Sequence, residues 1–209
     1  MLSLISTPIG NLDDISLRAI DVIKSADFIY TEDTRSFKKI LDAIECKKKC
    51  KSFHEHNEDI ICKEIIKHLK NKKHVVLTCQ AGTPAISDPG YKLIRECLNL
   101  NLKYTLIPGP SSLINAVVLS GLPTDKFSFY WFIPKKNNAQ KKLFQKVSND
   151  EKTAIMFESV KRLRKTIISI SKHLDNNRHI SVCREMTKIH EQIVQGNCED
   201  LLKKIDCGS

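Results

Sequence analysis

Short runs of apolar residues alternate along the chain with longer stretches in which apolar residues recur every three or four positions. The short runs predict strands and the periodic stretches predict helices, because side chains at those spacings share one face of each element. In the first half, strands are expected at 2–6, 28–30, 51–54, 74–79 and 104–107. The run 74–79 is rich in β-branched residues, which is typical of a strand buried in a parallel sheet.

Helices are expected between these strands. The first follows Asp13 or Asp14, either of which can cap it, and the others lie at about 35–44, 60–69 and 91–100. Strands that alternate with helices in this way are typical of an α/β domain. The pattern therefore predicts an α/β fold with a largely parallel sheet.

The sequence Pro-Gly-Pro-Ser-Ser at 108–112 interrupts the pattern and is a natural boundary. Beyond it, strands are expected at 127–133, 153–157 and 179–183, and helices at 113–119, 140–147, 162–174 and 201–205. The aromatic residues of 127–132 alternate as in a strand, so at least half of them are expected in the core. The chain is thus predicted to form two α/β domains, 1–110 and 111–209.

Charge changes this picture in the second half. The 209 residues include 34 Lys and Arg against 24 Asp and Glu, a formal net charge of +10. Residues 1–110 carry 17 basic and 14 acidic side chains, whereas residues 111–209 carry 17 and 10. A one-sided basic excess favours a polyanionic partner such as RNA, although a lysine-rich composition is the alternative explanation.

Targeting and cysteine content point to a cytoplasmic protein. No window approaches the roughly 18 consecutive apolar residues of a membrane span, and the first residues lack the basic start of a signal peptide. The eight cysteines show no Cys-x-x-Cys spacing, so reduced thiols are expected. Cys46, Cys50, His54 and His56 cluster most tightly, but they match no common zinc pattern and lie among lysines, so no metal site is expected.

Polar turns follow the first four predicted strands, at 7–11, 32–35, 54–57 and 80–90. In open α/β sheets, ligands bind beyond the carboxyl ends of the strands, so these turns are the candidate site. The stretch 81–90 is dense in Gly, Pro and small polar residues, but it is neither a G-x-G-x-x-G nor a Walker A loop. A Rossmann dinucleotide site and nucleotide hydrolysis therefore lose support.

The same turns carry a specific resemblance. The ordered motifs are TPIGNL at 7–12, EDTR at 32–35, HEHNE at 54–58, AGTP at 81–84, ISDPG at 86–90, PGPSS at 108–112, GLPTD at 121–125 and REMTK at 184–188. This set resembles the ribosomal RNA small-subunit methyltransferase I family of the tetrapyrrole methylase superfamily. The resemblance covers essentially the whole chain.

The resemblance implies a homodimeric enzyme that transfers a methyl group from S-adenosylmethionine to the ribose 2′-oxygen of a cytidine. That cytidine would lie in the decoding centre of 16S ribosomal RNA in the small ribosomal subunit. The superfamily binds the cofactor in a cleft between two α/β domains. By resemblance, the cofactor-binding residues are Pro8, Gly82, Thr83, Pro84, Ile86, Ser111 and Ser112.

A ribose hydroxyl is a poor nucleophile until a base accepts its proton. Candidate bases on the turns are Glu32, Asp33, His54, Glu55 and Asp88, of which Asp33 and His54 are the catalytic candidates. Two other roles stay open: Asp33 can act as a helix N-terminal carboxylate, and His54 can organise its loop or contact RNA.

The predicted substrate contacts combine acidic, amide and basic side chains. Phosphate contacts by lysines position RNA without reading its sequence, whereas an exposed aromatic ring can stack on an unpaired base. The expected substrate-binding residues are Glu32, Arg35, Glu55, Asn57, Asp88, Lys135, Lys136 and Arg184.

The sequence also departs from the family pattern. Gln80 stands where an Asp usually precedes Ala-Gly-Thr-Pro, and Val160-Lys161 replaces a Pro-His pair. Relatives continue beyond the position of Ser209, so a second domain truncated at its C-terminus is expected. A non-catalytic RNA-binding remnant and a methyltransferase for a small tetrapyrrole are the alternative functions.

Overall fold

The computed structural model describes residues 1–205, and its chain divides into two compact units. The first unit is Met1–Ser112 and the second begins at Leu113, whereas the sequence pattern placed a boundary between residues 110 and 111. No helix among the described residues is long and apolar enough to cross a membrane.

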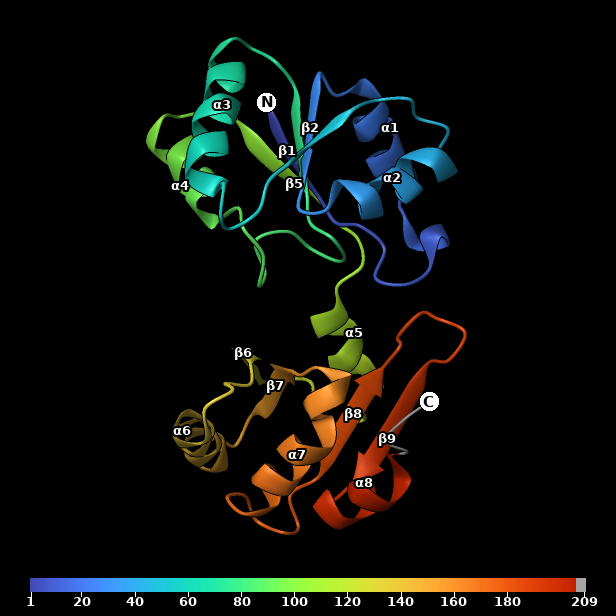
Figure 1. Ribbon diagram of the computed structural model, residues 1–209, viewed down its shortest axis with the longest axis vertical. Helices are drawn as coiled ribbons and strands as arrows, with labels where there is room; N and C mark the ends of the chain where they lie inside the picture. Colours follow the sequence, from blue (N-terminus) through green and yellow to red (C-terminus); the bar gives the residue numbers. More distant parts are fainter. Residues whose placement is uncertain (206–209) are drawn as a thin grey trace. The chain divides into compact units, whose positions relative to one another are not determined.

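A five-stranded sheet organises the first unit (Figure 1). Its strand order is β3-β2-β4-β1-β5, and all neighbouring strands pair in parallel. The strands are β1 (Leu2–Ile5), β2 (Phe28–Thr31), β3 (Cys50–Ser52), β4 (Val75–Thr78) and β5 (Tyr104–Ile107). Every residue of β1 and β4 is buried, which confirms the predicted parallel sheet and its buried β-branched strand.

Helices cover both faces of this sheet (Figure 1). Apolar side chains of α1 and α2 pack into one core cluster, and those of α3 and α4 pack into another on the opposite face. The amphipathic spacing of each helix explains this arrangement, because one stripe must be buried against the sheet. The helices are α1 (Leu17–Ser25), α2 (Thr34–Ala43), α3 (Glu58–Lys70) and α4 (Tyr91–Asn99).

The predicted cap of the first helix is wrong. Asp13 and Asp14 lie in a short 3-10 turn, Leu12–Asp14, and α1 begins later, with the Ser16 hydroxyl accepting a hydrogen bond from the Ala19 N–H at 3.2 Å. The local turn ends at Ile15, whose extended backbone separates it from the helix. Ser16 is the next side chain that can satisfy an unpaired N–H of the first helical turn.

The second unit contains two separate two-stranded sheets. Strands β6 (Phe127–Phe132) and β7 (Thr153–Phe157) pair in parallel, whereas β8 (Ile180–Arg184) and β9 (Gln192–Gly196) form an antiparallel hairpin. Its helices are α5 (Ser112–Leu119), α6 (Asn137–Ser148), α7 (Val160–Ser171) and α8 (Cys198–Lys204). The strand β9 was not predicted, because its glutamines and its glycine interrupt the apolar alternation.

The aromatic strand β6 departs from its predicted burial. None of its residues is fully buried, although at least half of its aromatic residues were expected in the core. The pairing of β6 with β7 shifts register between Phe129 and Phe132. A shift of this kind breaks the two-residue alternation that the prediction assumed.

Candidate functional site

The loops that follow β1 and β4 are joined directly at the carboxyl edge of the first unit's sheet. Thr7 and Gly82 form an antiparallel bridge, with N–H to oxygen distances of 2.9 and 3.0 Å. The Ser6 N–H also donates to the Ile107 carbonyl oxygen at 3.2 Å, which ties the end of β5 to the same place. Three loops that are far apart in the sequence therefore meet at one edge, as the parallel topology requires.

The Thr83 hydroxyl strengthens this junction. It donates to the Pro110 carbonyl oxygen at 3.2 Å and lies 3.1 Å from the Ser6 hydroxyl. Gly82, which precedes it, has a φ of +82°, a conformation that glycine adopts without a Cβ clash. A Cβ at Gly109 would come within 3.1 Å of the Ser6 Cβ, so that loop also passes very close to β1.

The junction brings together most of the predicted cofactor residues. Pro8, Gly82 and Pro84 are buried, whereas the Ile86 side chain is 47% exposed. Ser111 and Ser112 follow Pro110 directly and are half-buried. The edge thus combines buried glycine and proline residues with two half-buried serines and an exposed isoleucine.

Buried hydroxyl groups without a partner mark the same edge. The Oγ1 atoms of Thr7, Thr31 and Thr78 are buried and have no hydrogen-bond partner within the described residues. Thr31 and Thr78 are opposite each other in the β2–β4 register, at the last residue of each strand. Buried polar groups are normally paired, so these hydroxyls are free to bond to a ligand or to water.

Two carboxyl groups, those of Glu32 and Asp88, also belong to the loops at this edge. The Glu32 Oε2 accepts a hydrogen bond from the Gln80 N–H at 3.3 Å, which links the ends of β2 and β4. Burial, and then the charge of Glu32, raise the pKa of Asp88 to about 6. Burial and the nearby Asp88 also raise the pKa of the Cys79 thiol, whose Sγ lies 3.2 Å from the Gly82 carbonyl oxygen.

Asp33 is engaged in capping α2. Its Oδ1 accepts hydrogen bonds from the Arg35 N–H at 2.8 Å and the Ser36 N–H at 3.4 Å. The bond from the Arg35 backbone is the largest cause that lowers the pKa of Asp33. Arg35 itself extends outward, with a side chain that is 92% exposed and an Nε 3.6 Å from Asp33 Oδ1.

The loop after β3 is organised by Asn57. Its Oδ1 accepts from the His54 N–H at 2.8 Å, and its Nδ2 donates to the Ser52 carbonyl oxygen at 3.1 Å. The His54 Nδ1 is buried without a partner among the described residues, whereas Glu55 and His56 are exposed. His54 is therefore held in place by its backbone while one ring nitrogen stays available.

The predicted RNA contacts of the second half belong to the second unit. Lys135 and Lys136 are exposed immediately before α6, and Arg184 is the last residue of β8. They share no element with the loops described above.

Several residues of the edge escaped the sequence prediction. Thr78 and Cys79 were read as strand residues, Thr31 was placed directly after its strand, and Glu58 was not assigned a role. Glu58 is buried, and its Oε1 accepts the Gly90 N–H at 3.0 Å, which anchors the end of the long loop to α3. A threonine as the last residue of two adjacent strands is the signal that could have identified the hydroxyl pair.

Within residues 1–205, no three His, Cys, Asp or Glu side chains converge in a way that could hold a metal ion. The seven cysteines of this range are free, and Cys207 lies outside the described residues.

Comparison with known proteins places the whole chain in a family. The family described as Tetrapyrrole (Corrin/Porphyrin) Methylases matches residues 1–202. A protein of Rickettsia prowazekii named ribosomal RNA small subunit methyltransferase I is 41% identical over 202 residues, which are 97% of this chain and 72% of that protein. The chain belongs to the ribosomal RNA small subunit methyltransferase I family of tetrapyrrole methylases.

Other members of this methyltransferase I family are similarly related. The protein of that name from Halalkalibacterium halodurans is 39% identical and is covered over 68% of its length, and that of Thermotoga maritima is 37% identical and covered over 91%. A crystal structure of diphthine synthase matches this chain over its whole length and is itself covered over 86% of its chain. The TM-score is 0.73 and the sequence identity is 17%. That likeness confirms the α/β fold of the family.

Proposed function

We propose that this methyltransferase I family member transfers a methyl group from S-adenosylmethionine to the ribose 2′-oxygen of a cytidine in 16S ribosomal RNA. The observation that carries the proposal is the extent of the likeness: relatives at 37–41% identity over nearly the whole chain bear the name of a ribosomal RNA small subunit methyltransferase. The proposed setting is a cytoplasmic homodimer that acts on the decoding centre of the small subunit.

The carboxyl edge of the first unit fits the cofactor. Gly82 has a φ of +82°, so a side chain there would be strained, and the buried hydroxyls of Thr31 and Thr78 have no hydrogen-bond partner among the described residues. When bound, S-adenosylmethionine supplies a methyl group that its sulfonium already activates. The residues proposed to hold it are Pro8, Gly82, Thr83, Pro84, Ile86, Ser111 and Ser112.

We assign the proton acceptor to Asp88. Its pKa of about 6 leaves it ionised at neutral pH but far more basic than an ordinary aspartate. Asp33 is less suited, because its carboxylate already accepts the N–H groups of α2 and its pKa is lowered. His54, with its unpartnered ring nitrogen, is the second candidate.

The reaction needs no further co-reactant. The loops after β1 and β4 would hold S-adenosylmethionine, which would supply the methyl group to the ribose 2′-oxygen and leave as the neutral thioether, while Asp88 would accept the hydroxyl proton. The chain's main contribution is alignment of the two reactants and exclusion of water. The loops joined by the Thr7–Gly82 bridge are largely buried, which favours both tasks.

The remaining predicted contacts are proposed to orient the RNA. Glu32, Glu55 and Asn57 present acceptor and amide groups near the edge, and Arg35 extends a cation from the start of α2. Lys135, Lys136 and Arg184 of the second unit are proposed to contact phosphates.

The decisive experiment supplies the purified chain with isotope-labelled S-adenosylmethionine and small ribosomal subunits that lack the modification. The expected result is label in 2′-O-methylcytidine after digestion of the RNA to nucleosides. Label in another nucleoside, or no label from a folded chain that binds the cofactor by calorimetry, would contradict the proposal.

Two controls separate the alternative functions. A remnant that only binds RNA should show no calorimetric heat with S-adenosylmethionine, and a methyltransferase for a small tetrapyrrole should release labelled product without ribosomal particles. The names of the relatives favour the ribosomal RNA substrate over both alternatives.

A further inference from the structure

Strand β6 contains an exposed tryptophan, Trp131, whose backbone conformation is unfavourable. Trp131 has a φ of +65°, and its side chain is 51% exposed. A bulky residue at positive φ is a true conformational outlier, and such strain tends to be retained at functional positions. The adjacent Phe132 is 52% exposed, so two large rings lie at the surface side by side in the sequence.

Both exposed rings contact other aromatic rings. The Trp131 ring lies 6.4 Å from that of Phe129, and the Phe132 ring packs edge-on against Phe157 at 5.3 Å. The register shift between Phe129 and Phe132 is what turns Trp131 away from the strand alternation. The exposed rings are thus fixed by packing rather than loosely attached.

The chain that follows is also held in place. Arg162 donates from Nη1 to the Ile133 carbonyl oxygen at 3.1 Å and from Nη2 to that of Pro134 at 2.9 Å. The Gln140 Nε2 donates to the same Pro134 oxygen at 2.8 Å. These bonds fix the short connection between the two rings and the lysines at the start of α6.

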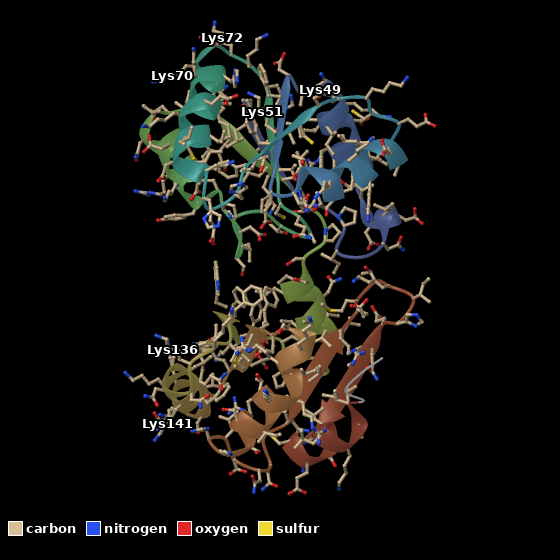
Figure 2. The ribbon with its side chains drawn as sticks, in the orientation of Figure 1. Lys49, Lys51, Lys70, Lys72, Lys136 and Lys141 are labelled. Carbon is tan, nitrogen blue, oxygen red and sulfur yellow. The ribbon has the colours of Figure 1, made fainter. Side chains whose placement is uncertain are left out.

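Positive charge predominates near the rings, although Asp150 accepts a hydrogen bond from the Tyr130 hydroxyl at 2.8 Å. Residues 126–149 contain six lysines and no Asp or Glu, and all six lysines are exposed: Lys126, Lys135, Lys136, Lys141, Lys142 and Lys146. Among the described residues none of them forms an ion pair, and Lys146 lies over the Tyr130 ring. Lys136, directly before α6, and Lys141, within α6, both project outward (Figure 2).

Several lysines of the first unit differ from those near the rings. Lys51 pairs with Glu64, Lys73 pairs with Asp27, and Lys48 donates to the Ala26 carbonyl oxygen. Positive charge in the first unit is therefore partly neutralised within the fold. The charge along α6 has no such internal partner, which leaves it available to an external polyanion.

We propose that Trp131 and Phe132 form a stacking platform for an unpaired base of the RNA substrate, with Lys135, Lys136 and Lys141 contacting the flanking phosphates. The inference rests on the proposed function, since it takes RNA as the substrate. Exposed rings beside unpaired lysines match single-stranded nucleic acid, in which every base offers an aromatic face and every linkage a negative charge. A protein partner of this surface would need a dense acidic patch and is the competing outcome of the test.

Trp131 is the only tryptophan of the chain, so its fluorescence reports directly on this surface. A short single-stranded oligoribonucleotide of mixed sequence should quench the emission as a base stacks on the ring. Inorganic polyphosphate, which offers charge but no base, should bind without comparable quenching. Equal quenching by both polyanions, or none by the oligoribonucleotide, would overturn the platform.

The matched variant is Trp131→Gly, because glycine adopts positive φ without strain, which offsets part of the packing that is lost against Phe129. Its affinity for a fluorescently labelled oligoribonucleotide should fall about 5- to 150-fold, the usual range for loss of one stacked base. Unchanged affinity in a variant that circular dichroism shows to be folded would refute the role of the ring. Self-association that the substitution abolishes would assign the surface to a second copy instead.

Charge is tested by the double variant Lys135→Gln/Lys136→Gln, with Lys165→Gln/Lys203→Gln on α7 and α8 as the control. The slope of log affinity against log salt should fall by about 1.4 for the first pair, since each phosphate contact on a single strand contributes about 0.7. The control pair should leave the slope near that of the parent chain. Equal effects of both pairs would mean that diffuse charge, and not this surface, attracts the RNA.

The readouts separate this inference from the proposed function, because quenching needs neither cofactor nor methyl transfer. Methylation of ribosomal RNA without tryptophan quenching would leave the function standing and remove the platform. Quenching by RNA from a chain that does not bind S-adenosylmethionine would keep the platform and remove the enzymatic proposal.

Discussion

The two units of this chain use their strands in opposite ways. In the first unit, five parallel strands lie between two helical layers, and the inner strands β1 and β4 are buried along their whole length. In the second unit, four strands form two separate pairs, and no residue of β6 or β8 is fully buried. A buried sheet positions loops precisely at its edge, whereas a partly exposed pair of strands leaves side chains free to contact a partner.

Charge follows the same division. The first unit is nearly balanced, and several of its lysines are paired internally. The second half carries most of the net positive charge, and its α6 lysines have no internal ion pair among the described residues. The difference between the units supports the proposals that the loops of the first unit hold the cofactor and that the lysines of the second contact RNA. Four experiments test these proposals.

The largest effect is expected at the edge of the first unit. Asp88→Asn keeps the size of the side chain but removes the proton acceptor, so methyl transfer should fall about 100- to 10,000-fold while cofactor affinity changes little. In the parent chain, the rate should also decrease below about pH 6 as Asp88 becomes protonated. Both are measured by the label-transfer assay across pH, with Asp33→Asn as the matched control. A greater loss in Asp33→Asn would reassign the base.

The second prediction is that the hydrophobic cores of the two units unfold independently. Leu77→Ala in the first unit and Ile167→Ala in the second each remove a buried aliphatic side chain, at a cost of about 2–5 kcal/mol. Tryptophan fluorescence reports on the second unit alone, because Trp131 is the only tryptophan, and circular dichroism reports on both units. In denaturant titrations, Leu77→Ala should move the dichroism transition and leave the fluorescence transition in place. A common shift of both transitions would show that the units unfold together.

The joined loops are tested by Gly82→Ala. The positive φ of Gly82 makes an alanine there unfavourable by about 1–2 kcal/mol, so the melting temperature and the cofactor affinity should both decrease. Gly109→Ala is a useful comparison, because its strain would come only from contact with Ser6 and not from positive φ. An unaltered melting temperature in Gly82→Ala would mean that the loop relaxes without cost.

The smallest effect concerns how the ionisation of Asp88 lowers the free energy of unfolding. In the folded chain its pKa is about 6, which is above the ordinary value of 3.8. The Asp88 carboxyl therefore stabilises the fold fully below about pH 3.8, and this stabilisation is lost as the pH rises through about 6. Asp88→Asn should therefore raise the free energy of unfolding by about 1–2 kcal/mol at pH 8, after allowance for its partial exposure, and change it little at pH 3.5. Denaturant titration at the two pH values measures this difference. An equal change at both values would mean that the substitution acts through packing.

Much of the first unit could be predicted from periodicity. The five strands, the largely parallel sheet and the buried run 75–78 follow from local patterns of apolar residues, whereas the order of the strands does not. The loops at the carboxyl edge were predicted for the same reason, since strand ends are visible in the sequence. The second unit was less accessible, because the glutamines of β9 hide its alternation and the register shift at Trp131 moves aromatic residues out of the core.

The candidate site shows the same limit. Asp33 and Asp88 are chemically identical in the sequence, yet one caps a helix and the other is desolvated beside Glu32. The sequence by itself determined the alternation of elements, the excess of positive charge and the set of loops that can reach a ligand. Only the tertiary structure decided which loops are bonded together, which carboxylate has a raised pKa and which ring stands at the surface. Periodicity is a local property, whereas burial and pairing depend on neighbours that are distant along the chain.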